Sequence, residues 1–195
     1  MDAIKNPARR KEFLASRALM RRMLSEIFPV RPEQWQFQEQ DNASPWVSNL
    51  PDGVHVNLSH SKGFICFAIA DVPVGIDIEV RDPTRNFTAL AKLFMSDAER
   101  TRLSREARQS DYFYRCWCIK EAYYKAQPRQ RQDSLSFNSI EVENFDPLAE
   151  GWYLTEGRIE DCYLAVICRH RPISVQCRYY PDPADWPQPF VEAVT

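Results

Sequence analysis

The stretch VGIDIEV, residues 74–80, places two carboxylates two positions apart inside a short apolar run. Side chains on a β-strand alternate between its two faces, so Asp77 and Glu79 share one face while the isoleucines share the other. Two carboxylates held side by side repel each other, and a shared cation relieves that repulsion. The stretch therefore predicts a strand with one packing face and one acidic face. An edge strand whose acidic face is merely solvated is the alternative.

A second stretch, WCIKEAYYK at residues 117–125, lies about forty residues further on, in a helical pattern without Gly or Pro. Glu121 and Lys125 are four residues apart and are therefore neighbours on one helical face. Alone, they would form an ordinary surface ion pair that contributes roughly 0.3 to 0.5 kcal/mol. Together with residues 74–80, they supply a third carboxylate and an adjacent ammonium group.

A third stretch, NLSHS at residues 57–61, precedes both. In this order, over residues 57–125, the three segments resemble the signature of 4′-phosphopantetheinyl transferases of the surfactin-synthetase-activating type. That signature has an Asn-hydrophobe-Ser-His-Ser segment, a Gly-hydrophobe-Asp strand, and an aromatic residue before Lys-Glu-(small)-x-x-Lys. The resemblance implies an α+β fold of two halves related by a pseudo-twofold axis. Each half would be a helix packed on a small antiparallel sheet, with the active site between the halves.

The resemblance also implies a reaction: transfer of 4′-phosphopantetheine from coenzyme A to a serine of an apo acyl, peptidyl or aryl carrier protein, with release of adenosine 3′,5′-bisphosphate. It implies Mg²⁺, or Mn²⁺ in its place, bound by Asp77, Glu79 and Glu121. Mg²⁺ suits such a site because it favours a few carboxylates together with substrate phosphate and water. Glu121 is the first candidate for the base and Glu79 the second, and Lys125 would bind and stabilise the transferred phosphoryl group.

For coenzyme A itself, the resemblance implies that Ser59 and His60 contact the 3′-phosphate. Arg17, in the segment at residues 16–19, corresponds to an arginine of the family's N-terminal helix. Lys120 lies about 100° around the helix from Glu121, so it either holds a phosphate or forms an ion pair. Both possibilities for Lys120 stay open at the level of sequence.

The expected partner is an acidic helical bundle, the usual carrier protein of the family. Residues 128–134 replace the family's glycine-containing loop with a segment that carries Arg129 and Arg131. We predict that this segment docks the carrier, because a positive rim speeds encounter with an acidic partner. A solvated loop without function is the alternative. Residues 43–45 depart from the family as well, since Ala-Ser-Pro replaces the usual Gly-Lys-Pro.

Composition places the chain among ordinary soluble proteins. Its 195 residues are 44% hydrophobic and 27% charged, with a net charge of −2. No run approaches the ~20 apolar residues of a membrane span, so we expect a cytoplasmic protein that does not bind membranes. We also expect a monomer that does not bind nucleic acid. Residues 1–31 hold eight Lys or Arg against three acids, which indicates a possible anion site. Six cysteines without a Cys-x-x-Cys pair indicate reduced thiols rather than a zinc site.

Hydrophobic periodicity divides the chain at residue 83 into halves 1–83 and 84–195. Helices are expected over residues 7–28, 86–95, 97–107 and 110–126, with Ser96 starting the third. Strands are expected over residues 54–58, 64–70, 74–80, 135–142, 162–169 and 173–180, the first three as an antiparallel meander. The core face of the first helix is expected to hold Phe13, Leu19, Met20, Met23 and Ile27.

Other classes of function fit the same residues less well. A metal-dependent phosphohydrolase would also gather acids and a lysine. A non-enzymatic adaptor could use the basic N-terminal helix on an acidic partner. A kinase or dehydrogenase is disfavoured, because the five glycines include no phosphate-cradling loop.

Overall fold

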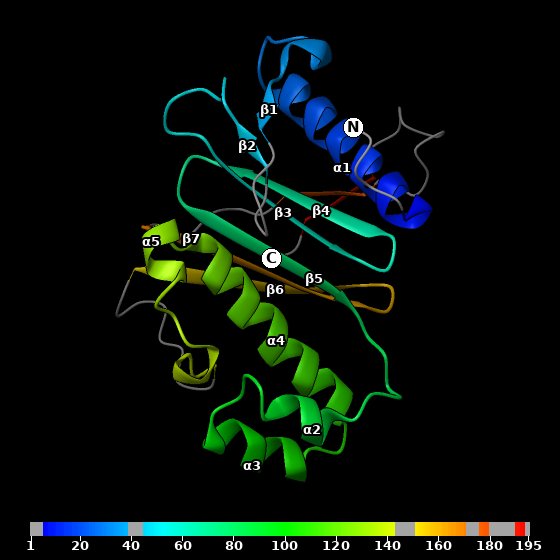
Figure 1. Cartoon of the computed structure of the whole chain (residues 1–195), viewed down its shortest axis with the longest axis vertical. Helices are drawn as coiled ribbons and strands as arrows, with labels where there is room; N and C mark the ends of the chain where they lie inside the picture. The colour runs from blue at the N-terminus through cyan, green and yellow to red at the C-terminus, as the bar shows by residue number, and fades with distance from the viewer. Residues whose placement is uncertain (1–5, 39–44, 143–150, 171–175, 180–189, 194–195) are drawn as a thin grey trace.

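The computed structural model describes residues 6–38, 45–142 and 151–170, together with the backbone of residues 176–179 and 190–193. Helices and small antiparallel sheets are mixed along the chain (Figure 1), so the predicted α+β class is confirmed. Among the described residues, no helix is both long and apolar enough to cross a membrane.

The helices are α1 (Pro7–Ile27), α2 (Phe87–Ala91), α3 (Asp97–Arg105), α4 (Gln109–Ala126) and α5 (Arg129–Gln132), with 3₁₀ turns η1 (Pro32–Gln34) and η2 (Phe137–Ser139). The strands are β1 (Phe37–Gln38), β2 (Trp46–Val47), β3 (His55–Ser61), β4 (Phe64–Ala70), β5 (Val74–Val80), β6 (Trp152–Ile159), β7 (Cys162–Arg169), β8 (Gln176–Tyr179) and β9 (Phe190–Ala193). The predicted start of α3 is confirmed: the Ser96 hydroxyl accepts from the Glu99 amide, and the Glu99 carboxylate accepts from the Ser96 amide.

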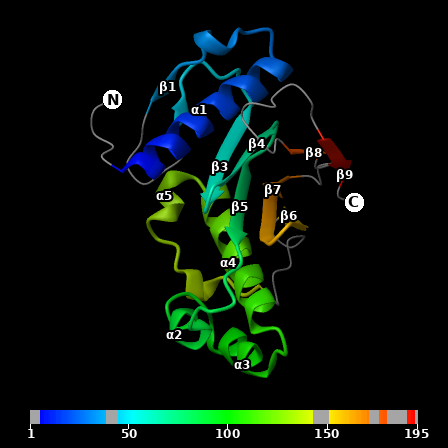
Figure 2. The ribbon, with the colours of Figure 1, turned by 90° about the vertical axis from the view of Figure 1, so that its right-hand side faces the viewer.

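Helix α1 crosses one face of the β3–β4 hairpin (Figure 2). The Asn6 side chain caps its first turn, and Leu19, Met20 and Leu24 face the hairpin. The prediction that Ile27 belongs to this core is wrong, because its side chain is 55% exposed. The helix ends there, and the ring of the next residue, Phe28, turns back to pack on a buried tryptophan.

Strand β5 pairs with a partner that the sequence did not predict. Strands β3 and β4 form the expected hairpin, but β5 pairs antiparallel with β7, in a sheet of order β5-β7-β6. The predicted three-strand meander is therefore wrong at its third strand. Since β7 is apolar along nearly its whole length, it takes the central position, where a strand is buried on both faces. The boundary at residue 83 stays a prediction, although β5 before it and β7 after it share one sheet.

Two further elements differ from expectation. The strand predicted over residues 135–142 is wrong, because its middle forms the turn η2. Strand β6 was not predicted, and its WYLTEGRI sequence carries polar residues and a glycine. Its strand conformation follows from pairing with β7 along its whole length, a long-range contact that local pattern does not report.

The two faces of β5 have different neighbours. The aliphatic face packs in an apolar core, as predicted, and the side chains that it meets there include those of β7. The other face lies against α4, whose Phe113 and Trp117 contact aromatic rings of the α2–α3 region and η2, as predicted for core packing. Five cysteines in the described residues are free thiols, while Cys177 lies outside the described side chains. Because β5 lies against α4, the strand and the long helix place the two acidic motifs face to face.

Candidate active site

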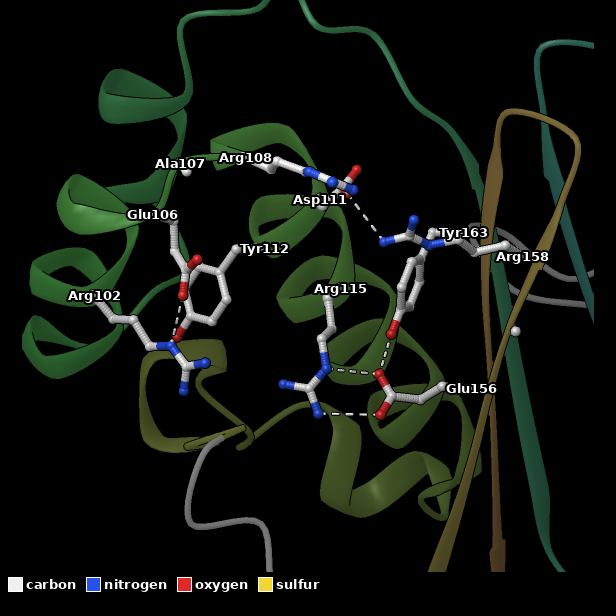
Figure 3. Close-up of a pocket in the computed structure, with 11 residues that line it drawn as sticks. Arg102, Glu106, Ala107, Arg108, Asp111, Tyr112, Arg115, Glu156, Arg158 and Tyr163 are labelled. Atoms are coloured by element: carbon white, nitrogen blue, oxygen red, sulfur yellow. Dashed lines mark hydrogen bonds and ion pairs between the residues drawn. The ribbon is translucent and has the colours of Figure 1, made fainter.

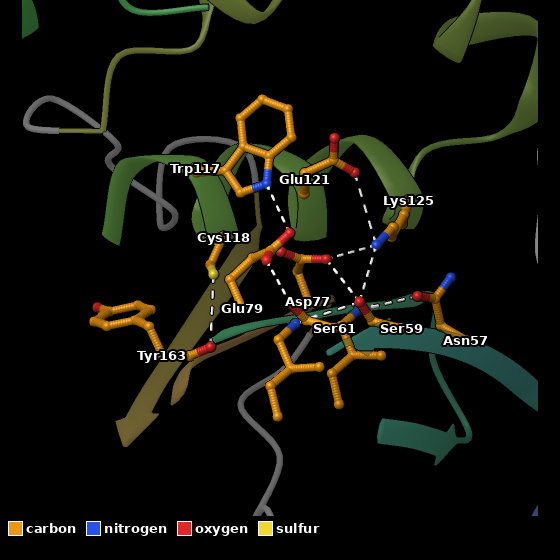
Figure 4. Close-up of polar contacts among 12 residues, drawn as sticks. Asn57, Ser59, Ser61, Asp77, Glu79, Trp117, Cys118, Glu121, Lys125 and Tyr163 are labelled. Atoms are coloured by element: carbon orange, nitrogen blue, oxygen red, sulfur yellow. Dashed lines mark hydrogen bonds and ion pairs between the residues drawn. The ribbon is translucent and has the colours of Figure 1, made fainter. Parts of the chain in front are cut away.

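The site lies where β5 and α4 approach each other most closely. A Cβ atom on Gly75 would sit 1.9 Å from the carbonyl oxygen of Ala122 and 2.7 Å from the amide nitrogen of Ala126. Glycine is therefore required here so that the helix backbone can lie directly on the strand. Two and four residues further along the same face of β5, Asp77 and Glu79 point at α4 (Figure 4).

Asp77 is almost completely buried, at 3% exposure. Its Oδ1 accepts hydrogen bonds from Nζ of Lys125 at 2.6 Å and from the hydroxyl of Ser59 at 2.8 Å. Its Oδ2 is buried too, and no N–H or O–H donor within the described part of the chain reaches it. A buried carboxylate oxygen without a donor is costly, unless a cation or water supplies the missing interaction.

Glu79 lies beside Asp77 and is held at both oxygens. Oε2 accepts from the hydroxyl of Ser61 at 2.7 Å, and Oε1 accepts from the indole N–H of Trp117 at 3.3 Å. Burial raises the pKa of Glu79 above its ordinary value, and the charge of Asp77 raises it further against these two hydrogen bonds. The indole contact means that Trp117 positions an acid of the site as well as packing in the core.

Glu121 and Lys125 reach the same place from α4. Burial raises the pKa of Glu121, the charge of Lys125 opposes this, and the charges of Asp77 and Glu79 add to it. Nζ of Lys125 lies 3.7 Å from Oε2 of Glu121, so the ammonium group lies between this carboxylate and Asp77. Although burial lowers the pKa of Lys125, the two carboxylates outweigh it and raise that pKa overall. The four residues predicted to form the site are therefore brought together.

The donor set has the chemistry of a site for a hard divalent cation. It offers three carboxylates. The pKa values of Glu79 and Glu121 are raised by burial and by the charges of the other acids, and Oδ2 of Asp77 is buried without an N–H or O–H donor in the described part of the chain. Within the residues whose side chains are described, no three His, Cys, Asp or Glu side chains are already arranged as a metal centre. In this structure the ammonium of Lys125 provides the positive charge between Asp77 and Glu121.

The structure separates the residues predicted to contact coenzyme A. Ser59 is buried and faces Asp77. His60, the next residue on β3, points to the opposite side, is half-exposed, and places Nδ1 3.1 Å from a carboxylate oxygen of Glu12 on α1. Arg17 is half-buried on α1, with its guanidinium 4.5 Å from the centre of the Phe13 ring. His60 and α1 thus lie on the far side of the hairpin from the acids.

Lys120 forms an ion pair, which is one of the two roles that its position in the sequence allowed; the other was a phosphate contact. It is completely buried, and Nζ lies 2.5 Å from Oε2 of Glu99. The same ammonium donates to the carbonyl oxygens of Phe94 and Phe137, each at 3.0 Å. All three protons of the ammonium are therefore used in joining α4 to α3 and η2.

A cavity of about 480 Å³ opens beside Glu121. Tyr124, Leu135 and Phe137 supply its apolar wall, and Gln132 at the end of α5 closes another side. The segment at residues 128–134, predicted to dock a carrier, thus helps to line the same cavity as Glu121, the first candidate for the base. The docking role of the segment stays a prediction.

A second cavity, of about 640 Å³, lies between the end of α3, the start of α4 and strands β6 and β7 (Figure 3). Its charged side chains are paired across it: Arg115 with Glu156 at 2.8 Å, and Arg158 with Asp111 at 3.1 Å. Hydrogen bonds and charges of neighbouring arginines lower the pKa of Asp111 although burial opposes them. The cavity is lined by an ion-pair network and contains none of the predicted site residues.

Sequence reasoning missed Asn57 and Ser61, to which it gave no role. Ser61 donates to Glu79, and Asn57 accepts from the backbone amide of Ile76. The available signal was their spacing, since Asn57, Ser59 and Ser61 alternate on one face of a strand and must point the same way.

Comparison with known proteins agrees with this geometry. The family model of the 4′-phosphopantetheinyl transferase superfamily matches residues 73–166. A 4′-phosphopantetheinyl transferase of Bacillus subtilis is 30% identical over 170 residues, which is 86% of this chain and 73% of that protein. Psf-1 of Bacillus pumilus is 36% identical over 113 residues, 57% of this chain and 48% of its own length. Sfp of Bacillus subtilis strain 168 is 34% identical over 109 residues, 55% of this chain and 47% of its own.

The matches to psf-1 and Sfp thus span about half the length of those two proteins. The match to the family model includes the strand and the helix that carry the acids. The longer match reaches across most of both chains. On these comparisons the chain belongs to the 4′-phosphopantetheinyl transferase superfamily.

Proposed function

We propose that this chain transfers 4′-phosphopantetheine from coenzyme A to a serine hydroxyl of an apo carrier protein and releases adenosine 3′,5′-bisphosphate. The observation that carries the proposal is the meeting of Asp77, Glu79, Glu121 and Lys125 between β5 and α4. We infer the reaction of this cluster from the family to which the chain belongs. A cytoplasmic location and a monomeric state remain predictions from the sequence.

In this proposal, Asp77, Glu79 and Glu121 hold Mg²⁺. When bound, the ion neutralises the pyrophosphate of coenzyme A and makes it a better electrophile. Lys125 stays protonated because its pKa is raised, so its ammonium can bind an oxygen of the phosphoryl group being transferred. Ser59 supports this arrangement by donating to Asp77 while lying 3.3 Å from Nζ of Lys125.

The base that takes the serine proton is Glu121 in this proposal. Glu121 lines the cavity of about 480 Å³, so an acceptor hydroxyl can reach it. Glu79 is less available, because both of its oxygens already accept hydrogen bonds from Ser61 and Trp117.

For the 3′-phosphate of coenzyme A we keep His60 and Arg17, on the α1 side, and no longer propose Ser59, whose hydroxyl is turned to Asp77. Arg17 carries a guanidinium group, and His60 is half-exposed. If His60 reads this phosphate, 3′-dephospho-coenzyme A should bind more weakly than coenzyme A in wild type, and the difference should shrink in His60→Ala. An unchanged preference in the variant would remove His60 from the assignment.

The direct test incubates the purified chain with coenzyme A, Mg²⁺ and an apo carrier protein, and measures the intact mass of the carrier. One added phosphopantetheinyl group is expected with wild type and none with Asp77→Ala. Asp111→Asn is a matched control, because it changes a half-buried acid of the second cavity. Failure of wild type to modify any of several carriers would contradict the proposal, and cleavage of coenzyme A without a carrier would favour the phosphohydrolase alternative.

A further inference from the structure

Strands β3 and β5 are joined by side chains rather than by main-chain pairing. The amide of Ile76 donates to the side-chain oxygen of Asn57 at 3.1 Å. The amides of Ile78 and Val80 donate to the hydroxyl oxygens of Ser59 and Ser61, at 3.3 and 3.2 Å. Both sets of residues ascend in steps of two, so the two strands run parallel, and β5 uses its other edge to pair with β7.

The two serines make a second contact that Asn57 does not make. A hydroxyl group has one proton to donate, and its lone pairs accept. Because each serine accepts an amide of β5, its own proton is directed elsewhere, and in both cases it goes to an acid of that same strand. Ser59 donates to Asp77 at 2.8 Å and Ser61 donates to Glu79 at 2.7 Å.

Ser61 thus holds Glu79 through two bonds at once, one to the backbone of the strand and one to the carboxylate. Ser61 is 9% exposed, so water has little access to replace it. Glu79 is otherwise held through the longer indole contact of 3.3 Å. Each serine lies 18 residues before the acid that it contacts. The residue at the same spacing from Asn57 is Gly75, which has no carboxylate, so Asn57 serves as a comparison.

We propose that Ser61 is a positioning residue that fixes the orientation of the Glu79 carboxylate for metal binding. The two serines of NLSHS thereby hold the acids of β5, while His60 between them faces the other side of the hairpin. This inference rests on the metal site of the proposed function. It predicts a specific division: Ser61 acts on metal binding and turnover, and the Asn57 bond acts on stability alone.

The test measures binding of Mn²⁺ by its paramagnetic resonance signal, in the presence of coenzyme A, for wild type, Ser61→Ala, Ser61→Thr and Asn57→Ala. Groups that orient a metal ligand typically change affinity by about 10- to 100-fold. We expect Ser61→Ala to weaken Mn²⁺ binding about tenfold and to lower kcat, with the KM for coenzyme A unchanged. Ser61→Thr, which keeps the hydroxyl, should recover most of the affinity.

Asn57→Ala is the control, because it removes one bond between β3 and β5 without touching a carboxylate. It should lower the unfolding temperature as Ser61→Ala does, yet bind Mn²⁺ like wild type. Equal weakening in both alanine variants, or wild-type binding by Ser61→Ala, would overturn the positioning role. If wild type itself binds no Mn²⁺, the metal site of the proposed function is refuted, which is a distinct result from failure of the Ser61 inference.

Discussion

Replacing Gly75 with alanine should inactivate the protein more completely than its small size suggests. The added Cβ would lie 1.9 Å from the carbonyl oxygen of Ala122, whereas an ordinary contact needs at least 3.4 Å. The helix backbone must therefore move away from β5 by about 1.5 Å, because the oxygen belongs to the helix main chain and the Cβ is bonded directly to the main chain of the strand. Lys125 lies on the same helix, and its 2.6 Å bond to Asp77 would be stretched beyond hydrogen-bonding distance.

Two effects of different size follow from this shift. Overpacking of this kind costs about 1–3 kcal/mol of folding free energy, so much of the protein should stay folded in mild conditions. Misplacing catalytic groups by about 1 Å costs about 100-fold in rate, so kcat should fall by at least that factor. Steady-state transfer assays and denaturant unfolding measure the two effects on one preparation.

The control is Gly157→Ala in β6, where the new Cβ would meet a single side-chain atom at 3.9 Å and no backbone strain arises. This variant should keep wild-type activity and equal or higher stability, because alanine loses less chain entropy than glycine. Wild-type kcat in Gly75→Ala would refute the argument that the close approach of α4 to β5 builds the site.

Three further variants test separate parts of the structure. Lys120→Ala should lower the free energy of unfolding by about 3–5 kcal/mol, because it leaves the buried carboxylate of Glu99 without its cation; a raised KM for coenzyme A in folded protein would instead indicate a phosphate contact. Asp111→Asn should destabilise the protein at about pH 7, and less at a pH below the unfolded pKa of Asp111. The pKa of Asp111 is lowered in the fold, so its stabilisation is present above its unfolded pKa and is lost as pH falls through its folded pKa; equal destabilisation at both pH values would contradict this. Arg129→Glu with Arg131→Glu should raise the KM for an acidic carrier and flatten its salt dependence; an effect on the KM for coenzyme A alone would place α5 at the cofactor site.

Local pattern was sufficient for the elements that carry the site. The bounds of β5 were predicted to the residue, since alternation of apolar and acidic side chains is a short-range signal. Helix α4 was predicted over 110–126 and spans Gln109–Ala126, because its sequence holds no helix breaker. The alternation also gave the correct face to Asp77 and Glu79, and hence their direction toward α4.

Pairing between strands was the part that local pattern did not specify. Strand β4 is followed closely by β5, which favoured a meander, but β5 joins β7 more than eighty residues away. The reason lies in the side chains of β3: Asn57, Ser59 and Ser61 already satisfy the amides on one edge of β5. A strand whose amides are satisfied by side chains needs no main-chain partner on that edge, so the hairpin and the sheet stay separate.

The two lysines of the KEAYYK segment show why a motif predicts residues better than roles. Helical geometry alone places Lys120 about 100° from Glu121 and Lys125 on the same face as Glu121. What lies in each direction depends on distant segments: Asp77 from β5 for Lys125, and Glu99 from α3 for Lys120. A lysine that meets one buried acid and two carbonyl groups becomes a structural ion pair. One that meets two acids at the candidate active site stays charged, as the proposed phosphate contact requires. The same residue type, five positions apart, thus serves the fold in one case and the proposed chemistry in the other.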